Sequence, residues 1–343
     1  MRRQSLQQRQ NRSAQEPNRV PPARHGSSLP LPTSPGPHLV PNPRPRYSAL
    51  ALWHLLSLDA PTVATLWTVF IARCSHLHLP WTEPAAMFLA VWMIYAADRL
   101  LDARFSLSKL EPRHRFHHTH RTAFVTVIVL SSIALAALLH NLDPRSLHLY
   151  TLLATLLAAW MLLIHAHPAP HSPTSRLPKE FAVGIFFSAA VFIPTLARTT
   201  PGTSAIHFLG SAATWIRPNL LPAAILFACV CTLNCLCLYT WEHPTPRLQD
   251  LAAAEDTPHQ PAHWTTRWAT ARLTYLALAI LAASTIASAS RAVPIALPAL
   301  ACSLSTAALF ALNFYRRRLS PLHLRATADL VLLMPILFLP FLR

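Results

Sequence analysis

Hydrophobic residues form long runs along most of the chain. Several runs approach the roughly 20 residues that cross a hydrocarbon core of about 30 Å. Lipid offers backbone groups no water, so such runs are expected to be helices, whose hydrogen bonds are internal. The pattern predicts an all-α membrane bundle with nine spans, near residues 48–73, 82–102, 121–140, 146–167, 179–197, 219–242, 269–290, 292–315 and 324–342.

Two of these predicted spans have unusual boundaries. The first contains Asp59 and Pro61, so we expect it to be broken or to begin later, with Asp59 capping the segment after the break. The runs 269–290 and 292–315 are separated only by a tight turn at Arg291.

The first 46 residues differ from the rest. They hold ten prolines, eight arginines and one acid, Glu16. Such a segment buries too little apolar surface to fold, so residues 1–46 are predicted to be a disordered cytoplasmic tail. The tail lacks the apolar core of a signal peptide, so the first run should be a retained helix of a transmembrane domain at 47–343.

Composition narrows the function classes. The chain is 52% hydrophobic and 12% charged, as expected of a membrane protein rather than a soluble domain. It has five glycines and neither a dinucleotide-binding nor a P-loop motif. We expect membrane lipids, and no nucleic acid, among its partners.

Basic residues set the expected orientation, because Lys and Arg accumulate in cytoplasmic loops. With the N-terminus inside, the inner segments carry 22 basic residues and the outer segments carry 6. We therefore expect an integral protein of the bacterial inner membrane, with a cytoplasmic N-terminus and an external C-terminus.

Six carboxylates fall toward the cytoplasmic ends of the predicted spans. An acid deep in the bilayer costs roughly 2.5–3.5 kcal/mol, so such residues usually face a cavity or a partner. Their common side predicts a polar chamber that opens to the cytoplasm. The six residues are Asp59, Asp98, Asp102, Glu180, Glu242 and Asp329.

Asp98 and Asp102 are four residues apart and so share one helix face. Two such carboxylates can hold Mg²⁺ together with substrate phosphate oxygens. The alternative is a charged helix end, or an aspartate paired with Arg99 or Arg104.

Cations follow this pair. The next loop contains Arg113 and Arg115 among several histidines, and Lys179 opens the fifth span. Guanidinium groups suit phosphate binding. The alternatives are an ordinary basic cytoplasmic loop, an interfacial lysine or a separate histidine metal site.

The later spans add further candidates. Asn234 and Glu242 lie on one broad face of span six and offer a second oxygen-ligand site, or else an interhelical hydrogen bond and an end charge. Arg325 and Asp329, four residues apart, favour an internal ion pair. Gly184 permits close helix packing or makes room for a ligand. Four cysteines of span six (Cys229, Cys231, Cys235 and Cys237) are expected to be small packing residues rather than metal ligands.

Together these features resemble the UbiA superfamily of membrane-embedded prenyltransferases. The "DRLLD" segment, Asp98 to Asp102, is similar to the second half of that family's first Asp-rich motif, N-D-x-x-D-x-x-x-D. "NCLCLYTWE" occupies the place of the second motif. The sequence departs from the family at Ile94 and Tyr95, where the motif has Asn and Asp, and in having Asn234 and Glu242 for the usual aspartates.

The resemblance implies a Mg²⁺-dependent transfer of an isoprenoid chain from a prenyl diphosphate to a lipophilic, often aromatic, acceptor. It implies metal binding by Asp98, Asp102, Asn234 and Glu242. It implies contacts to the diphosphate from Arg99, Arg113, Arg115, Lys179 and Arg325. The alternatives are a non-catalytic UbiA-like scaffold and a transporter or lipid-binding membrane protein.

Overall fold

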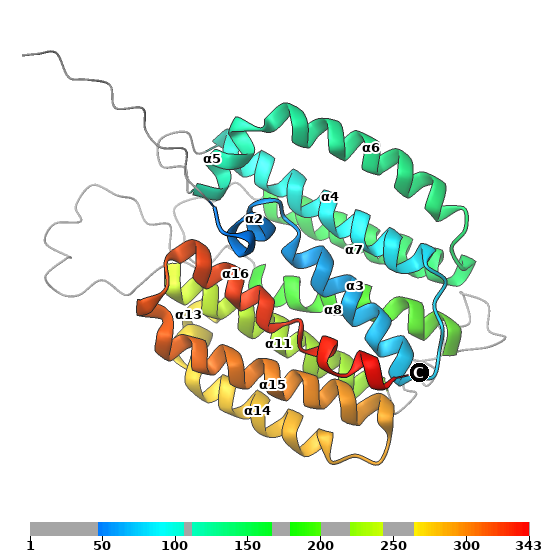
Figure 1. Ribbon diagram of the computed structural model, residues 1–343, viewed down its shortest axis with the longest axis vertical. Coiled ribbons are helices and arrows are strands. Elements are labelled where there is room, and N and C mark those ends of the chain that lie inside the picture. Colours follow the sequence, from blue (N-terminus) through cyan, green and yellow to red (C-terminus); the bar gives the residue numbers. More distant parts are fainter. Residues whose placement is uncertain (1–46, 106–111, 167–178, 200–219, 243–263, 343) are drawn as a thin grey trace, which may run out of the picture. The chain divides into compact units, whose positions relative to one another are not determined.

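The computed structural model describes residues 47–105, 112–166, 179–199, 220–242 and 264–342, which contain helices and no strand. The predicted tail lies outside these residues. Figure 1 shows the helices. In chain order they are α2 (Ala49–Leu55), α3 (Asp59–Cys74), α4 (Thr82–Phe105), α5 (Pro112–Thr119), α6 (Arg121–Leu139), α7 (Pro144–Ala166), α8 (Lys179–Thr199), α11 (Leu221–Glu242), α13 (Trp264–Ala271), α14 (Leu273–Ser288), α15 (Val293–Tyr315) and α16 (Pro321–Val331), with short 3-10 turns η1 (Arg316–Arg318), η2 (Met334–Leu337) and η3 (Leu339–Phe341).

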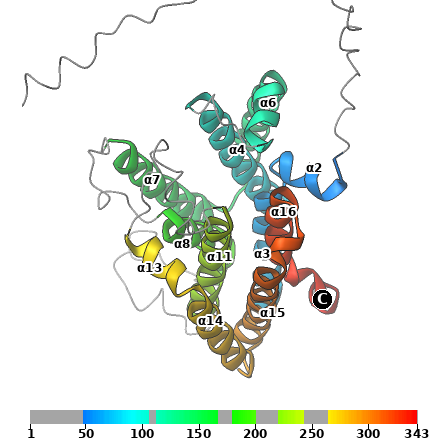
Figure 2. The same ribbon diagram turned by 90° about the vertical axis from the view of Figure 1, so that its left-hand side faces the viewer.

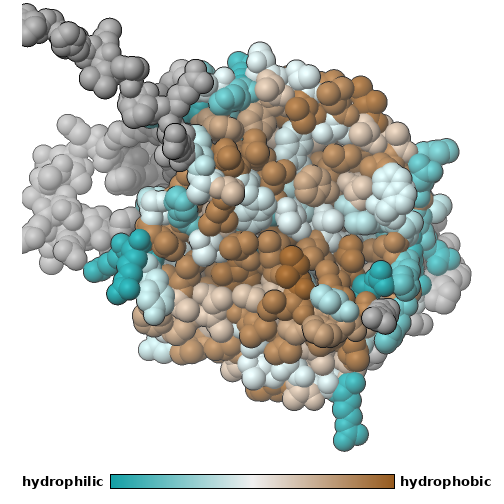
Figure 3. Space-filling view, in the orientation of Figure 1, coloured by the Kyte–Doolittle hydropathy of each residue, from teal (hydrophilic) through white to brown (hydrophobic). Residues whose placement is uncertain are grey.

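The predicted all-α fold is confirmed over the described residues. Six helices are long and apolar enough to cross a membrane, or up to nine if each of three bent pairs forms one span. The bent pairs are α2 with α3, α13 with α14, and α16 with the 3-10 turns that follow it. Figure 3 shows a broad hydrophobic surface with hydrophilic residues gathered at its margins. These features are consistent with an integral membrane protein.

The core forms where α3, α8, α11 and α15 pack together (Figures 1 and 2). Trp67 and Phe70 of α3 and Phe227 of α11 are fully buried there. The rings of Trp67 and Phe227 lie 4.1 Å apart, and the Trp67 indole N–H donates to the Leu332 carbonyl at 2.8 Å. The hydrogen bond fixes the chain just after α16 against the centre of the bundle.

Gly184 allows α8 to lie very close to α11. A Cβ at this position would lie 2.1 Å from Thr232 Oγ1 and 2.7 Å from the Ala228 carbonyl oxygen. Both distances are too short for a real carbon contact. The close-packing interpretation of Gly184 is therefore confirmed.

The first predicted span is broken, as expected. Helices α2 and α3 meet at 89°, and Ser57 between them has a φ of 58°. That left-handed conformation is uncommon for a residue with a side chain. The buried Ser57 hydroxyl forms a 3.1 Å hydrogen bond with Nε2 of His117 on α5, which holds the corner in place.

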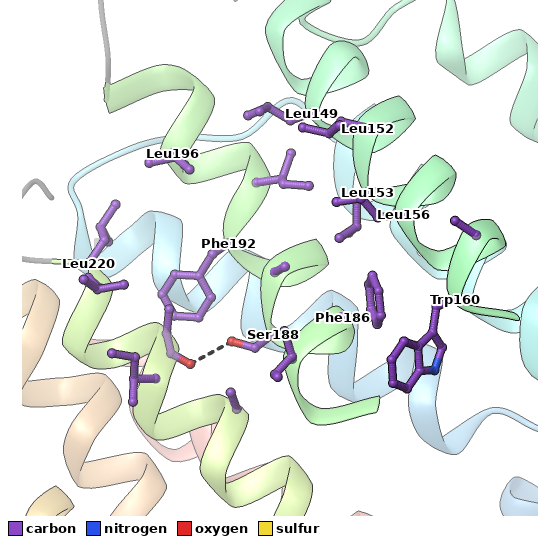
Figure 4. Close-up of a pocket in the computed structure, with 18 of the residues that line it drawn as sticks. Leu149, Leu152, Leu153, Leu156, Trp160, Phe186, Ser188, Phe192, Leu196 and Leu220 are labelled. Carbon is purple, nitrogen blue, oxygen red and sulfur yellow. Dashed lines mark hydrogen bonds between the residues drawn. The ribbon is translucent and has the colours of Figure 1, made fainter. Parts of the chain in front are cut away.

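Helices α6 and α7 lie at the periphery. In each, only a small share of the apolar span is buried, 11% in α6 and 6% in α7. Their exposed large hydrophobic side chains are Val, Leu and Ile with one Met, which suits contact with lipid tails. An apolar pocket of about 760 Å³ lies between α7, α8 and α11 (Figure 4).

Candidate functional site

Five polar residues from five helices meet at the corner between α2 and α3, and we call them the corner cluster. Asp59 Oδ2 lies 3.1 Å from Arg99 Nη2 and 2.6 Å from His54 Nδ1. Asp329 Oδ2 lies 3.7 Å from the same His54 nitrogen, and Asp329 Oδ1 accepts a 3.0 Å hydrogen bond from Asn234 Nδ2. The cluster therefore joins α2, α3, α4, α11 and α16 through charged and polar side chains.

One face of α4 supports this corner. Trp92 and Arg99 are seven residues apart, which leaves them about 20° apart around a helix. Trp92 Nε1 donates to the Leu56 carbonyl at 3.0 Å, and Arg99 Nη1 donates to the His54 carbonyl at 2.6 Å. These carbonyls stand where α2 ends and partners within the helix run out, although the His54 carbonyl also accepts from the Ser57 backbone N–H at 3.1 Å.

A second ion pair lies on the same two helices as Asn234 and Asp329. Arg325 of α16 pairs with Glu242 of α11, and the Arg325 side chain is 8% exposed. The sequence favours a pair between Arg325 and Asp329 on α16. In the described contacts, Arg325 instead pairs with Glu242 and Asp329 with Asn234, both of which lie on α11.

The other predicted site residues are distributed around this end of the bundle. Asp98 is exposed on α4, one residue before the buried Arg99. Arg115 on α5 and Lys179 at the start of α8 are exposed. The side chains of Asp102 and Arg113 lie outside the described residues. Arg99, predicted to contact a diphosphate, instead pairs with Asp59.

The Asn234–Glu242 half of the Mg²⁺ set implied by the resemblance does not fit the described geometry. Asn234 and Glu242 are eight residues apart on α11, so they are separated by about 12 Å along the helix axis. Ligands of one Mg²⁺ each lie about 2 Å from it, and Glu242 is also paired with Arg325. The two residues do not form one metal half-site, and no chemical step is assigned to Mg²⁺ here.

Residues at two departures from the family motif take contrasting positions. Tyr95, in place of an aspartate, is partly buried and packs against the main core, whereas Ile94 is 51% exposed.

The predicted packing role of the cysteines is supported, since the four on α11 are free thiols that are buried or partly buried. Among the described residues, only His54, Asp59 and Asp329 form a group with metal-ligand geometry.

The histidines after α4 also take separate roles. His117 bonds to Ser57 and stacks on Phe124 with ring centroids 4.2 Å apart. His120 is exposed and its Nδ1 contacts the Phe116 carbonyl. The structure describes no site in which these histidines meet around a metal.

A further buried ion pair lies far from the corner cluster. Arg198 Nη1 donates to Glu83 Oε2 at 2.6 Å, and the Glu83 side chain is fully buried. Glu83 precedes Arg99 by 16 residues on α4, which places it about 24 Å away along the helix. Local sequence patterns do not indicate this pair.

Sequence patterns did not indicate His54, and for Asp59 they indicated a helix cap and a place in the polar chamber but no partner. The break at Asp59 was visible in the sequence, and a polar residue on each side of a break inside an apolar run is the signal that points to the site. Their partners, Arg99 and Asp329, lie 40 and 275 residues from Asp59 and His54, beyond the reach of local patterns.

Comparisons of the chain with protein-family models, with curated proteins and with solved structures find no match.

Proposed function

We propose that the chain is a membrane-embedded prenyltransferase that binds a prenyl diphosphate at the end of the bundle marked by the corner cluster. One observation carries the proposal. The two helices with the motif-like segments, α4 and α11, direct Arg99 and Asn234 into one buried polar cluster. A prenyltransferase built on those two segments needs both helices beside one site, and the shared cluster supports this arrangement.

The reaction needs positive charge and an apolar environment. Breaking the allylic C–O bond sends its electron pair to the diphosphate and leaves a carbocation. The acceptor supplies an electron pair for the new bond and releases a proton. The growing charge on the diphosphate is stabilised by nearby cations. Arg115 and Lys179 are exposed and suited to this role, while Arg99 and Arg325 hold the helices through ion pairs.

An apolar pocket offers room for the lipophilic part of a substrate. The pocket between α7, α8 and α11 is lined almost entirely by apolar side chains, including Trp160, Phe186 and Phe192 (Figure 4). Its one polar side chain, Ser188, donates to the Ala224 carbonyl at 2.8 Å. An apolar pocket with its polar atom satisfied suits an acyl or isoprenoid chain.

The test is ligand-dependent stability of the full-length protein in detergent. A non-hydrolysable prenyl thiodiphosphate, offered in several chain lengths, is expected to raise the unfolding temperature more in the presence of Mg²⁺ than in its absence. Asp98→Asn should abolish the Mg²⁺-dependent part. Asp143→Asn is the matched control, because Asp143 lies on the α6–α7 turn, where its carboxylate accepts from the Arg145 backbone N–H. No stabilisation of a folded wild type at any chain length contradicts the proposal.

A transporter or lipid-binding protein is the second candidate, and broken helices favour it. The corner cluster stands beside the 89° break between α2 and α3, and the 50° break after α16 follows Asp329 closely. Transporters often build binding sites at such breaks. Release of inorganic diphosphate from a prenyl diphosphate, with a lipid extract as acceptor source, separates the two candidates. Binding without release supports a transporter or a scaffold.

A further inference from the structure

The corner cluster contains a compact group of possible metal ligands. One ligand atom each from His54, Asp59 and Asp329 lies within 4.8 Å of the other two. The side chains of His54 and Asp59 are each 3% exposed, and that of Asp329 is 18% exposed. They come from the end of α2, the start of α3 and the last turns of α16, so folding of the whole bundle creates the group.

Two buried polar atoms beside this group have no hydrogen-bond partner among the described residues. They are Oδ1 of Asn234 and Nε2 of His54. Asn234 is 6% exposed, and the nitrogen of the same amide binds Asp329, so its free oxygen belongs to the cluster. Leaving a buried acceptor unsatisfied costs about 1–3 kcal/mol. A ligand for Asn234 Oδ1 would remove this cost.

The net charge of the corner cluster also favours a bound cation. Asp59 and Asp329 bring two negative charges, and Arg99 brings one positive charge. The adjacent Arg325–Glu242 pair is neutral as a unit. With a neutral imidazole at His54 the buried cluster therefore carries one net negative charge. A buried charge needs a counter-charge.

We propose that the corner cluster binds a divalent cation through His54, Asp59 and Asp329, with Asn234 Oδ1 as a further ligand. One nitrogen and three oxygens suit Mn²⁺ or Zn²⁺, because Mg²⁺ prefers oxygen donors and waters. The bound cation joins the two helix breaks, since Asp59 opens α3 and Asp329 lies just before the bend after α16. The site shares no carboxylate with the Asp98–Asp102 pair and does not depend on prenyl transfer.

The experiment measures cation binding by the full-length protein in detergent, without any prenyl ligand and without a polyhistidine tag. Chelator-treated protein is titrated with Mn²⁺, and loss of the free Mn²⁺ signal is followed by electron paramagnetic resonance. We expect about one tight site per chain. Losing a supporting residue around a metal typically weakens affinity about 10- to 100-fold. Asp329→Asn exchanges a charged ligand for a neutral amide and His54→Gln removes the ring nitrogen, so each should weaken binding at least as much.

Glu83→Gln is the matched control. Glu83 is also a buried carboxylate paired with an arginine, but it lies at the far end of α4. This variant should lose stability and keep Mn²⁺ binding. Gel filtration and unfolding curves establish which variants are folded.

If the variants at His54 and Asp329 do not fold, Asn234→Asp provides a second test. It places a third carboxylate in the cluster, so its unfolding temperature should fall without cation and recover with Mn²⁺ more than that of the wild type. The absence of tight Mn²⁺ and Zn²⁺ binding by folded wild type would overturn the proposal. Equal Mn²⁺ affinity of wild type and folded Asp329→Asn would overturn it too. Either result would leave a proton, on His54 or on one of the two aspartates, to balance the charge.

Discussion

Arg99 Nη2 lies 3.1 Å from Asp59 Oδ2, and both side chains are almost completely buried. The arginine next to the exposed Asp98 thus closes an ion pair between α4 and the start of α3. Removing one partner of a buried pair leaves the other charge uncompensated, which typically costs about 3–5 kcal/mol. We expect this pair to contribute strongly to holding the start of α3, just after the break in the first span, against α4.

Asp59→Asn should therefore lower the stability of the detergent-purified protein by about 3–5 kcal/mol. Unfolding can be followed with a thiol-reactive dye, because Cys74 and Cys302 are buried and react only when the chain opens. The double variant Asp59→Asn with Arg99→Met leaves no unpaired charge at this pair and should be more stable than Asp59→Asn alone. A double variant that is the less stable of the two would contradict the buried-charge explanation.

The sequence predicts features that depend on neighbouring residues better than features that depend on contacts between distant helices. The spans and the break near Asp59 follow from local hydrophobicity and from Pro61, and the structure has the break and six to nine candidate spans. Partners across helices are different. Whether Arg99 turns toward a substrate or toward Asp59 depends on which face of α4 packs inward. Local patterns along a nearly uniformly apolar helix do not specify that face.

The same reasoning explains the pairings of α16. Arg325 and Asp329 share one face of that helix, so the sequence favours a pair between them. In the bundle, Glu242 and Asn234 of α11 face these two residues and form the described contacts. Tertiary packing therefore decides between two electrostatically reasonable arrangements.

Gly184→Ala should destabilise the α8–α11 interface. The new Cβ would lie 2.7 Å from the Ala228 carbonyl oxygen as well as 2.1 Å from Thr232 Oγ1, so the helices must separate. Overpacking of this kind typically costs about 1–3 kcal/mol. Adding Thr232→Ala should restore only part of the loss, since the backbone carbonyl remains. Thermal unfolding of the single and double variants checks this, and full recovery in the double variant would show that the carbonyl contact is unimportant.

Ser57 should show the reverse of the usual preference between alanine and glycine. Its φ of 58° strains any residue with a Cβ, and its hydroxyl bonds to His117. Both Ser57→Ala and Ser57→Gly lose the hydrogen bond, but only glycine relieves the strain, so it should be the more stable variant by about 1 kcal/mol. Ser131, buried in the middle of α6, is the control. There glycine should be less stable than alanine by about 1 kcal/mol. The same order at both positions would argue against strain at the corner.

The basic residues predict that the turn between α14 and α15 lies outside the cell and that the η1 turn lies inside. Ala289 and Arg317 are exposed at these two turns, and a cysteine at either position offers a reactive thiol. In intact cells a membrane-impermeant maleimide should label Ala289→Cys and leave Arg317→Cys unlabelled until the membrane is permeabilised. The wild type, whose six cysteines are buried or partly buried, gives the background. The opposite labelling pattern would invert the orientation and would place the corner cluster at the external face.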